Sequence, residues 1–362
     1  MQRLRLSAPI RALAALCPAL VIAAAACAGC APPLASSGND GVTVMSWNLM
    51  NLFDPVDSGN EYDDWSIAEG DWSEADYRMR LALAAKVILA STAGGPDLVL
   101  VQEAENLRVL DDLAAGPLAR RGYDWRVVAG DPGVLPAAVR VGVLSKLPIT
   151  AARSHSAALA DGSVADRAVL EIELDAAGLP LVVFVNHWKS RSGGDAETEG
   201  ERRAQAGLVA GLAAARLAER PGLALLVAGD LNEDPSEFDR VEWPTALVPA
   251  ERAAERPALE GRLLFAASGS AFPGLEEPVL VEPWIGADGF TYSYLGSRDR
   301  LDHLLCSPGL FDGAGLELHH FGVPDLPFLY DPDGLPFGWD PVLRDGYSDH
   351  LPVLAALGRR DA

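Results

Sequence analysis

Short apolar runs of the length of a β-strand recur along most of the chain. They occupy residues 42–47, 98–102, 125–129, 139–144, 168–174, 181–186, 223–228, 301–306 and 351–355. Two further segments, residues 79–89 and 198–217, have the Ala- and Leu-rich composition of longer helices. Many strands with few helices predict packed sheets flanked by helices, because a doubly wound parallel sheet would alternate strand with helix throughout.

The connections between these elements are mostly short. Two of them, residues 231–296 and 319–347, are long and rich in Pro and Gly. Loops of that length are usually functional or mobile. Because the chain has no internal repeat and no long linker beyond residue 41, we expect one large domain over residues 42–358.

The first thirty residues have the pattern of a bacterial export signal. Three arginines precede an apolar run over residues 12–26, which is followed by small residues and then by Cys30. The apolar run is too short for a confident membrane span. Small residues before a cysteine resemble the lipoprotein cleavage box, so we predict a signal over residues 1–29, a lipidated Cys30 and a tether over residues 30–41. Cys27 is the competing modified residue, and an ordinary secretory signal is the simpler alternative.

The signal predicts export, either to the cell envelope as a membrane-anchored lipoprotein or as a secreted protein. Three of the four cysteines lie within the first thirty residues, and Cys306 is the fourth. The mature domain therefore has no internal disulfide framework, and we expect Cys306 to behave as a buried small apolar residue.

Composition and charge limit the classes of function. Of 362 residues, 49% are hydrophobic and 22% charged, which excludes low-complexity disorder and coiled coil. The formal net charge is −22, so bulk electrostatics does not hold a polyanion to this chain. If the protein acts on phosphates, it needs a local positive charge that offsets its own negative electrostatic potential, and a divalent metal ion is the obvious source.

Polar side chains of metal-binding and phosphate-binding types lie where the predicted strands begin or end. The residues at these positions are Asn48, Glu103, His187, Asp230, Asn232, Asp302, Asp349 and His350. A site at one rim of a sheet needs this arrangement. Each motif alone is more often a turn or a satisfied structural pair, so the argument depends on all of them occurring together.

The ordered set resembles the endonuclease/exonuclease/phosphatase superfamily, to which pancreatic deoxyribonuclease belongs. The landmarks of that family occur here in order as Asn48, Gln102-Glu103, His187, Gly229-Asp230-Leu231-Asn232, Leu301-Asp302 and Ser348-Asp349-His350. They cover nearly the whole mature chain. Bacterial secreted nuclease-like members of the family have sequence segments similar to residues 47–54, 186–191 and 291–294. The resemblance implies an α/β (α+β) fold, a four-layer α-β-β-α sandwich of two packed, mainly antiparallel sheets.

The resemblance also implies a metal site. Glu103, helped by Asn48 and with Asp349 as a further carboxylate, would bind Mg²⁺, with Mn²⁺ or Ca²⁺ as the alternative ion. Such an ion neutralises the phosphate and stabilises the charge that grows on the leaving oxygen.

The remaining landmarks would do the acid–base chemistry. Asp230 would activate the attacking water, and Asn232 would hold the phosphate or the nucleophile in line. His350, oriented by Asp302, would contact the phosphate, and His187 would be a second phosphate donor or the leaving-group acid.

Other charged residues are weaker candidates. Lys189 and Arg191 follow His187 on a Ser- and Gly-rich loop and, with Arg202 and Arg203, are candidates for a basic lip that faces the phosphate. Arg167 precedes a predicted strand and is a further candidate for substrate binding. We expect His303, which adjoins Asp302 but points to the opposite face of its strand, to be structural.

The superfamily motifs specify the type of reaction but do not specify the leaving group. The leading hypothesis is a metal-dependent exported nuclease that hydrolyses DNA or RNA. The alternatives are a phospholipase-C-like or sphingomyelinase-like enzyme, which a lipid anchor in the membrane would suit, a small-molecule phosphodiesterase or phosphatase, and a non-catalytic binding protein on the same scaffold. No obligate protein partner is predicted.

Overall fold

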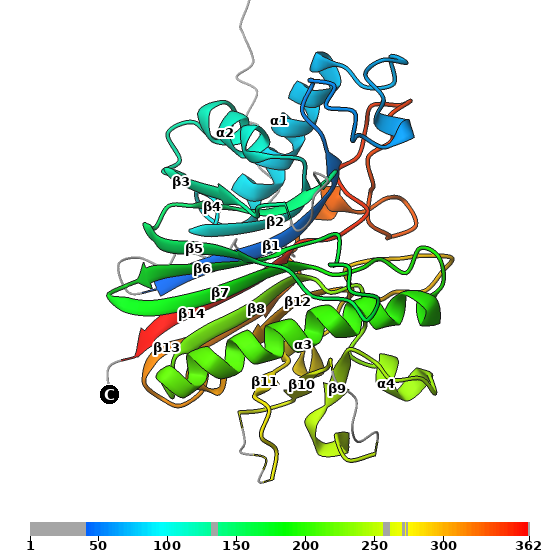
Figure 1. Cartoon of the computed structure of the whole chain (residues 1–362). Coiled ribbons are helices and arrows are strands. Elements are labelled where there is room, and N and C mark those ends of the chain that lie inside the picture. Colours follow the sequence, from blue (N-terminus) through cyan, green and yellow to red (C-terminus); the bar gives the residue numbers. More distant parts are fainter. Residues whose placement is uncertain (1–40, 132–136, 256–260, 270–271, 273, 361–362) are drawn as a thin grey trace, which may run out of the picture. The chain divides into compact units, whose positions relative to one another are not determined.

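The computed structural model describes residues 41–131, 137–255, 261–269, 272 and 274–360. The predicted export signal and both candidate lipidation residues, Cys27 and Cys30, lie outside the described residues. Within these ranges the strands form two sheets (Figure 1).

The first sheet has six strands. In spatial order they are β13 (Gly315–Gly322), β14 (Val353–Arg360), β1 (Gly41–Leu52), β2 (Leu98–Ala104), β4 (Arg140–Ser145) and β3 (Trp125–Val128). The pair β1 and β2 is parallel, and the other neighbours are antiparallel.

The second sheet has eight strands. In spatial order they are β5 (Ile149–His155), β6 (Val169–Ala176), β7 (Leu179–His187), β8 (Ala224–Asp230), β12 (Asp302–Cys306), β11 (Val279–Val281), β10 (Leu263–Ala266) and β9 (Leu247–Pro249). The pair β7 and β8 and the short strands β9 to β11 run parallel, and the other neighbours are antiparallel.

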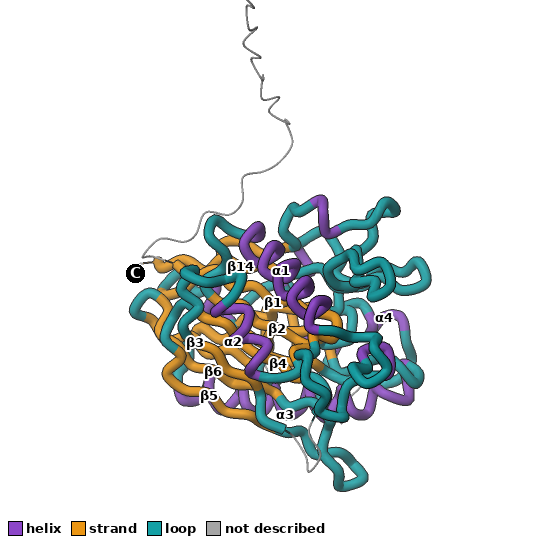
Figure 2. Tube along the Cα trace, turned by 90° about the horizontal axis from the view of Figure 1, so that it is seen from above, coloured by secondary structure: helices purple, strands orange, loops and turns teal. Residues whose placement is uncertain are grey.

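Helices cover the outer faces of both sheets. They are α1 (Glu74–Ser91), α2 (Leu107–Ala115), α3 (Asp195–Glu219) and the short α4 (Glu237–Arg240). Single 3₁₀ turns lie at Asp63–Trp65, Ala250–Arg252, Pro283–Gly286, Pro308–Leu310 and Pro327–Leu329. Figure 2 shows α1 and α2 over the first sheet, with α3 on the far side. The predicted four-layer sandwich of two mainly antiparallel sheets is confirmed.

Successive side chains of a strand point to opposite faces of its sheet, so each central strand contributes to two layers of the core. On β2, Leu98 and Leu100 face the core between the sheets, whereas Val99 and Val101 pack against α1 and α2. On β7, Val183 likewise faces the core between the sheets. Because both faces of the central strands are buried, their sequences are continuous apolar runs and not alternating ones.

Strand direction brings the functional motifs to one edge of the sandwich. In the parallel pairs, Asn48 of β1 is aligned with Gln102 of β2, and His187 of β7 with Asp230 of β8. The carboxyl ends of these four strands therefore share an edge. Strands β12 and β14 run antiparallel to β8 and β1, so their beginnings, Asp302 and the segment before β14, lie at the same edge.

The structure contains elements that the sequence pattern missed. Strands β9, β10 and β11 and helix α4 lie inside the segment that was expected to be a long loop, residues 231–296. Strands β5 and β13 and helix α2 also had no predicted counterpart, and β13 runs into the second expected loop, residues 319–347. Strands β9 to β11 are only three or four residues long, and β5 and β13 are edge strands without a continuous apolar run. They are strands because a neighbouring strand supplies their hydrogen bonds.

Several smaller predictions can be compared with the structure. Cys306 is buried in β12, as expected. His303 is fully buried and its Nδ1 lies 2.6 Å from Oε2 of Glu282, which confirms its structural role. No helix among the described residues is both long enough and apolar enough to cross a bilayer.

Gly229 is needed where β8 reaches the edge. Its φ is +130°, and a Cβ at this position would lie 1.9 Å from the carbonyl oxygen of Asn186 on β7. We expect Gly229→Ala to lower the free energy of unfolding by about 2 kcal/mol or more, measured by chemical denaturation.

Gly211 of α3 is the matched control, because an added Cβ there meets nothing within 4 Å. Gly211→Ala should raise stability by about 0.5–1 kcal/mol, since Gly weakens a helix interior. A Gly229→Ala protein as stable as the wild type would contradict the tight approach of β7 and β8.

Candidate active site

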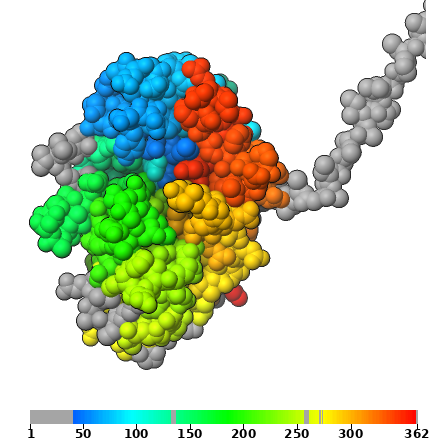
Figure 3. Space-filling view, turned by 90° about the vertical axis from the view of Figure 1, so that its right-hand side faces the viewer, coloured from blue at the N-terminus to red at the C-terminus, as the bar shows by residue number. Residues whose placement is uncertain are grey.

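A cavity of about 770 Å³ lies at the edge where the strand ends meet. Figure 3 shows this face, on which segments near residues 60, 190, 295 and 340 lie side by side. Of the residues predicted from the sequence, the cavity is lined by Glu103, His187, Arg191, Asp230, Asn232, Asp349 and His350. Asn48 and Asp302 are buried and bonded to these residues.

Asn48 connects the two sheets at the site. Its Nδ2 donates to Oε1 of Glu103 at 3.0 Å and to Oδ2 of Asp230 at 3.0 Å. Its Oδ1 accepts from the N–H of Met50 at 2.9 Å. Because both amide atoms are already engaged, Asn48 orients the two carboxylates and leaves Glu103 as the better direct ligand for a cation.

His350 lies between two carboxylates. Its Nδ1 is 2.8 Å from Oδ2 of Asp302, and its Nε2 is 3.8 Å from Oδ2 of Asp230. Burial disfavours the charged imidazole, but Asp302 and Asp230 outweigh burial and raise the pKa of His350 well above its ordinary value. These carboxylates therefore favour the imidazolium over the neutral ring, and Nε2 of His350 is too far from Oδ2 of Asp230 for a direct hydrogen bond.

The turn after β8 positions Asp230 and Asn232. The N–H of Asn232 donates to Oδ1 of Asp230 at 2.9 Å, and Nδ2 of Asn232 donates to the carbonyl of Trp188 at 3.1 Å. Asn232 has a φ of 51°, in the left-handed region that Asn tolerates better than most residues. Burial raises the pKa of Asp230, which His350 counteracts.

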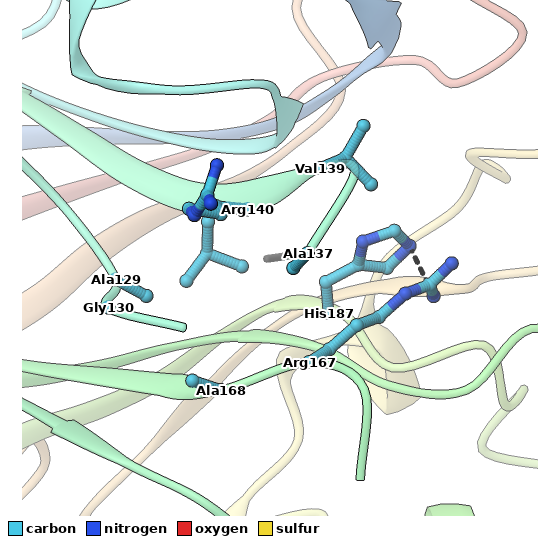
Figure 4. Close-up of a pocket in the computed structure, with 9 residues that line it drawn as sticks. Ala129, Gly130, Ala137, Val139, Arg140, Arg167, Ala168 and His187 are labelled. Atoms are coloured by element: carbon cyan, nitrogen blue, oxygen red, sulfur yellow. Dashed lines mark hydrogen bonds between the residues drawn. The ribbon is translucent and has the colours of Figure 1, made fainter. Parts of the chain in front are cut away.

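His187 is a hydrogen-bond acceptor in this structure. Its Nε2 lies 2.8 Å from Nη1 of Arg167, and an arginine can only donate, so the neutral imidazole carries its proton on Nδ1 (Figure 4). Burial and the charge of Arg167 hold the pKa of His187 well below its ordinary value. Among the described residues its Nδ1 has no partner, and the adjacent cavity of about 10 Å³ has the volume of one water.

The predicted basic residues have different positions. Nε of Arg191 donates to the carbonyl of Asn232 at 3.0 Å, and its Nη2 pairs with Glu237, so Arg191 supports the turn as well as lining the cavity. Lys189 is half-buried outside the main cavity. Arg202 is 2% exposed and paired with Glu199, so the prediction that it forms part of a basic lip is wrong.

Glu103 fits a divalent cation. Its Oε1 accepts from Asn48, its Oε2 accepts from the N–H of Asn51 at 2.8 Å, and the side chain still faces the cavity. Among the described residues, its ion-pair partner is His187 at 3.4 Å, which is neutral. A carboxylate has about four lone-pair positions, so two remain for a cation. Asp349, also on the cavity wall, adds an oxygen donor of the kind that Mg²⁺ prefers.

A second group of possible metal ligands overlaps the first. One donor atom of each of Asp230, Asp302 and His350 lies within 4.8 Å of the other two. Within this group, Nδ1 of His350 and Oδ2 of Asp302 are already bonded to each other at 2.8 Å. We therefore interpret Asp302 and His350 as a hydrogen-bonded pair and Glu103 as the centre of the metal site.

The sequence pattern did not single out two aromatic side chains at the site. Tyr292 stacks on His350 with ring centroids 4.7 Å apart, and Tyr294 is 63% exposed at the cavity mouth. Their segment, residues 291–294, contributes to the family resemblance in sequence but has no predicted role of its own. Their proximity to His350 depends on a pairing of Tyr292 with His350 that no local pattern encodes.

Comparison with known proteins agrees with the fold. A sequence model of the Endonuclease/Exonuclease/phosphatase family matches residues 43–247, which include Asn48, Glu103, His187 and Asp230. No curated protein matches the chain.

Solved structures with the same fold come from several sources. A family protein from Bacteroides thetaiotaomicron has a TM-score of 0.52 and 17% identity, over 88% of this chain and 97% of that chain. A mannosyl-6-phosphatase from the same organism has a TM-score of 0.52 and 17% identity, over 87% and 99%. TDP2 of D. rerio, complexed with a single strand DNA product, has a TM-score of 0.50 and 15% identity, over 88% and 99%. At these identities the likeness shows the fold alone.

The charge state of His350 can be tested directly. Asp302→Asn removes the carboxylate that most raises the pKa of His350, so the imidazole of the variant should lose its proton at a lower pH than in the wild type. An NMR titration of the histidine side chains measures this. His320 of β13, whose pKa is lowered by burial alone, should titrate alike in both proteins. Identical titration of His350 in both proteins would show that the pairing with Asp302 is wrong.

Proposed function

The chain belongs to the endonuclease/exonuclease/phosphatase family, whose members are metal-dependent phosphoric ester hydrolases, and from this premise we propose that it is an exported phosphodiesterase that cleaves nucleic acid by in-line attack of water. The observation that supports this most strongly is that Glu103, Asp230 and His350, distant along the chain, line one cavity.

Glu103 and Asp349 hold Mg²⁺ in this proposal, and Asn48 orients Glu103. When bound, the cation supplies positive charge that neutralises the phosphate and stabilises the leaving oxygen. Mn²⁺ and Ca²⁺ have the same preference for oxygen ligands and remain alternatives.

Asp230 takes the proton from the attacking water. Its Oδ1 accepts from the N–H of Asn232 and its Oδ2 accepts from Asn48, so its two oxygens are oriented before substrate binds. Its raised pKa brings the carboxylate closer to the range in which a general base is effective. Asn232, on the cavity wall, holds the phosphate in line.

His350 donates from Nε2 to a phosphoryl oxygen. Asp302 holds the other ring nitrogen, so the imidazole keeps both its orientation and its proton. Nε2 of His350 and Oδ2 of Asp230 are 3.8 Å apart, so an oxygen of the substrate or of water that lies beside the line joining them can contact both. His187, as an acceptor, orients Arg167, which adds a cation beside the site.

Two aromatic side chains favour a nucleic acid as the substrate. Tyr294 and Tyr292 give the cavity wall a surface on which a base can stack, and stacking contributes about 1–3 kcal/mol per base without needing a cationic groove. One structure with the same fold, TDP2, holds a single strand DNA product.

A small phosphoester is the second candidate. The two arginines that line the cavity, Arg191 and Arg240, are both paired with carboxylates, so the site has no track of available cations for a long polyanion. A cavity of about 770 Å³ also has the size of a small-molecule site. A phosphosugar, as the name of the mannosyl-6-phosphatase implies for that enzyme, or a phospholipid headgroup would suit it.

A substrate panel distinguishes these candidates. The purified protein with Mg²⁺ or Mn²⁺ should cleave plasmid DNA, RNA or single-stranded oligonucleotides, and a chelator should stop the reaction. Release of headgroup from phospholipid vesicles or of phosphate from sugar phosphates, without nucleic-acid cleavage, would favour the second candidate.

Asp230→Ala and His350→Ala are the controls for that panel. Each should lower turnover by about 100-fold or more, the scale of a lost acid–base group. Wild-type rates in both variants would show that the assigned site is wrong, and a wild type that hydrolyses no phosphoester would favour a binding protein.

Export rests on the N-terminal sequence. We predict that Cys30→Ser releases the protein from the membrane fraction of a bacterial host, because the lipid anchor can no longer be attached. Fractionation and immunoblotting measure this. Cys306→Ser should leave the protein anchored, and release by Cys27→Ser instead would identify Cys27 as the modified residue.

A further inference from the structure

Arg80 is a buried cation behind the metal site. It lies inside α1, is 3% exposed, and its guanidinium is between the rings of Trp65 and Trp339, with centroids 5.5 Å and 5.2 Å away. No carboxylate among the described residues lies within ion-pair distance of it. Burial lowers the pKa of Arg80 to about 9, and Asp349 and Glu103 act against that shift. A buried arginine without a direct anionic partner is costly, so its position needs an explanation.

Its hydrogen bonds go to a turn of unusual backbone. Nη2 of Arg80 donates to the carbonyl of Leu49 and, at 3.1 Å, to the carbonyl of Met50. Met50 and Asn51 have φ values of 53° and 54°, in the left-handed region, which costs about 1–2 kcal/mol for Met50 and less for Asn51, because Asn tolerates this region better than most residues. The turn needs an external contact that holds it.

The opposite edges of the same two peptide planes face the metal site. The peptide whose carbonyl belongs to Leu49 carries the N–H of Met50, which donates to Oδ1 of Asn48 at 2.9 Å. The peptide whose carbonyl belongs to Met50 carries the N–H of Asn51, which donates to Oε2 of Glu103 at 2.8 Å. Since a trans peptide is planar and its C=O and N–H point in opposite directions, a contact that fixes the carbonyls also aims the N–H groups.

We propose that Arg80 is a positioning residue of the metal centre, which holds Glu103 and Asn48 in the geometry that binds the cation by orienting these two peptide planes. The inference rests on the proposed metal-dependent function. The cation–π contacts with Trp65 and Trp339 stabilise the guanidinium where water is absent. Its positive charge also polarises both carbonyls, which strengthens the hydrogen bonds on the far side.

The test is the affinity of the full chain for Mn²⁺ without substrate, measured by isothermal titration calorimetry. Arg80→Met, which keeps an unbranched apolar side chain but removes the guanidinium and its donors, should raise the Kd by about 10-fold or more, the usual effect of losing a residue that orients a metal ligand. Arg80→Lys, which keeps a charge but loses the planar stacking group, should raise the Kd less. In both variants turnover should approach that of the wild type as metal is added.

Two variants on the same helix are controls. Arg78→Met removes an exposed arginine paired with Glu74 and should leave the Kd unchanged. Leu81→Ala removes a buried side chain, so it should lower stability without raising the Kd.

The outcomes separate the inference from the proposed function. A wild type that binds Mn²⁺ and Arg80 variants with the same Kd would overturn the positioning role alone. An equal rise of the Kd in Leu81→Ala would overturn it too, because general loosening would then explain the effect. A wild type that binds no divalent cation would overturn the inference together with the proposed metal centre. If Arg80→Met does not fold, Arg80→Lys decides, and an unchanged Kd in that variant overturns the inference.

Discussion

The site depends on the burial of like charges at the edge shared by two sheets. Glu103 comes from the first sheet and Asp230 from the second, and the amide of Asn48 donates to both. Two carboxylates brought together out of water repel each other, so such a cluster persists only with compensating donors and cations. Asn48 supplies donors, His350 supplies a positive charge, and a divalent ion at Glu103 would supply more.

This constraint explains why the proposed catalytic residues are so heavily bonded to one another. Asp302 orients His350, the N–H of Asn232 orients Asp230, and the N–H of Asn51 orients Glu103. Polar atoms fixed in advance need little reorganisation when charge develops in the reaction. The same bonds join strands that are distant in the sequence, so the chemistry of the site and the packing of the sandwich are coupled.

The acidity of the chain is consistent with a local solution to phosphate binding. A net charge of −22 repels polyanions at long range, and the arginines at the cavity are paired with acids. In the proposed function, attraction for a phosphate is therefore concentrated at the metal position, His350 and Arg167. Such a site recognises one phosphoryl group strongly and relies on its walls, where Tyr292 and Tyr294 lie, for the rest of the substrate.

The sequence alone determined the layered architecture, the central strands and most of the predicted residues that line the cavity. Continuous apolar runs mark strands buried on both faces, and polar residues interrupt those runs at strand ends. It did not reveal β5, β9 to β11, β13 or α2, nor that Arg202 is buried and Arg191 is paired with Glu237. No local pattern indicates that Tyr292 stacks on His350, or that Arg80 donates hydrogen bonds to the carbonyls of Leu49 and Met50. Those features depend on contacts between segments far apart along the chain, and only the packing of the two sheets decides which distant side chains meet.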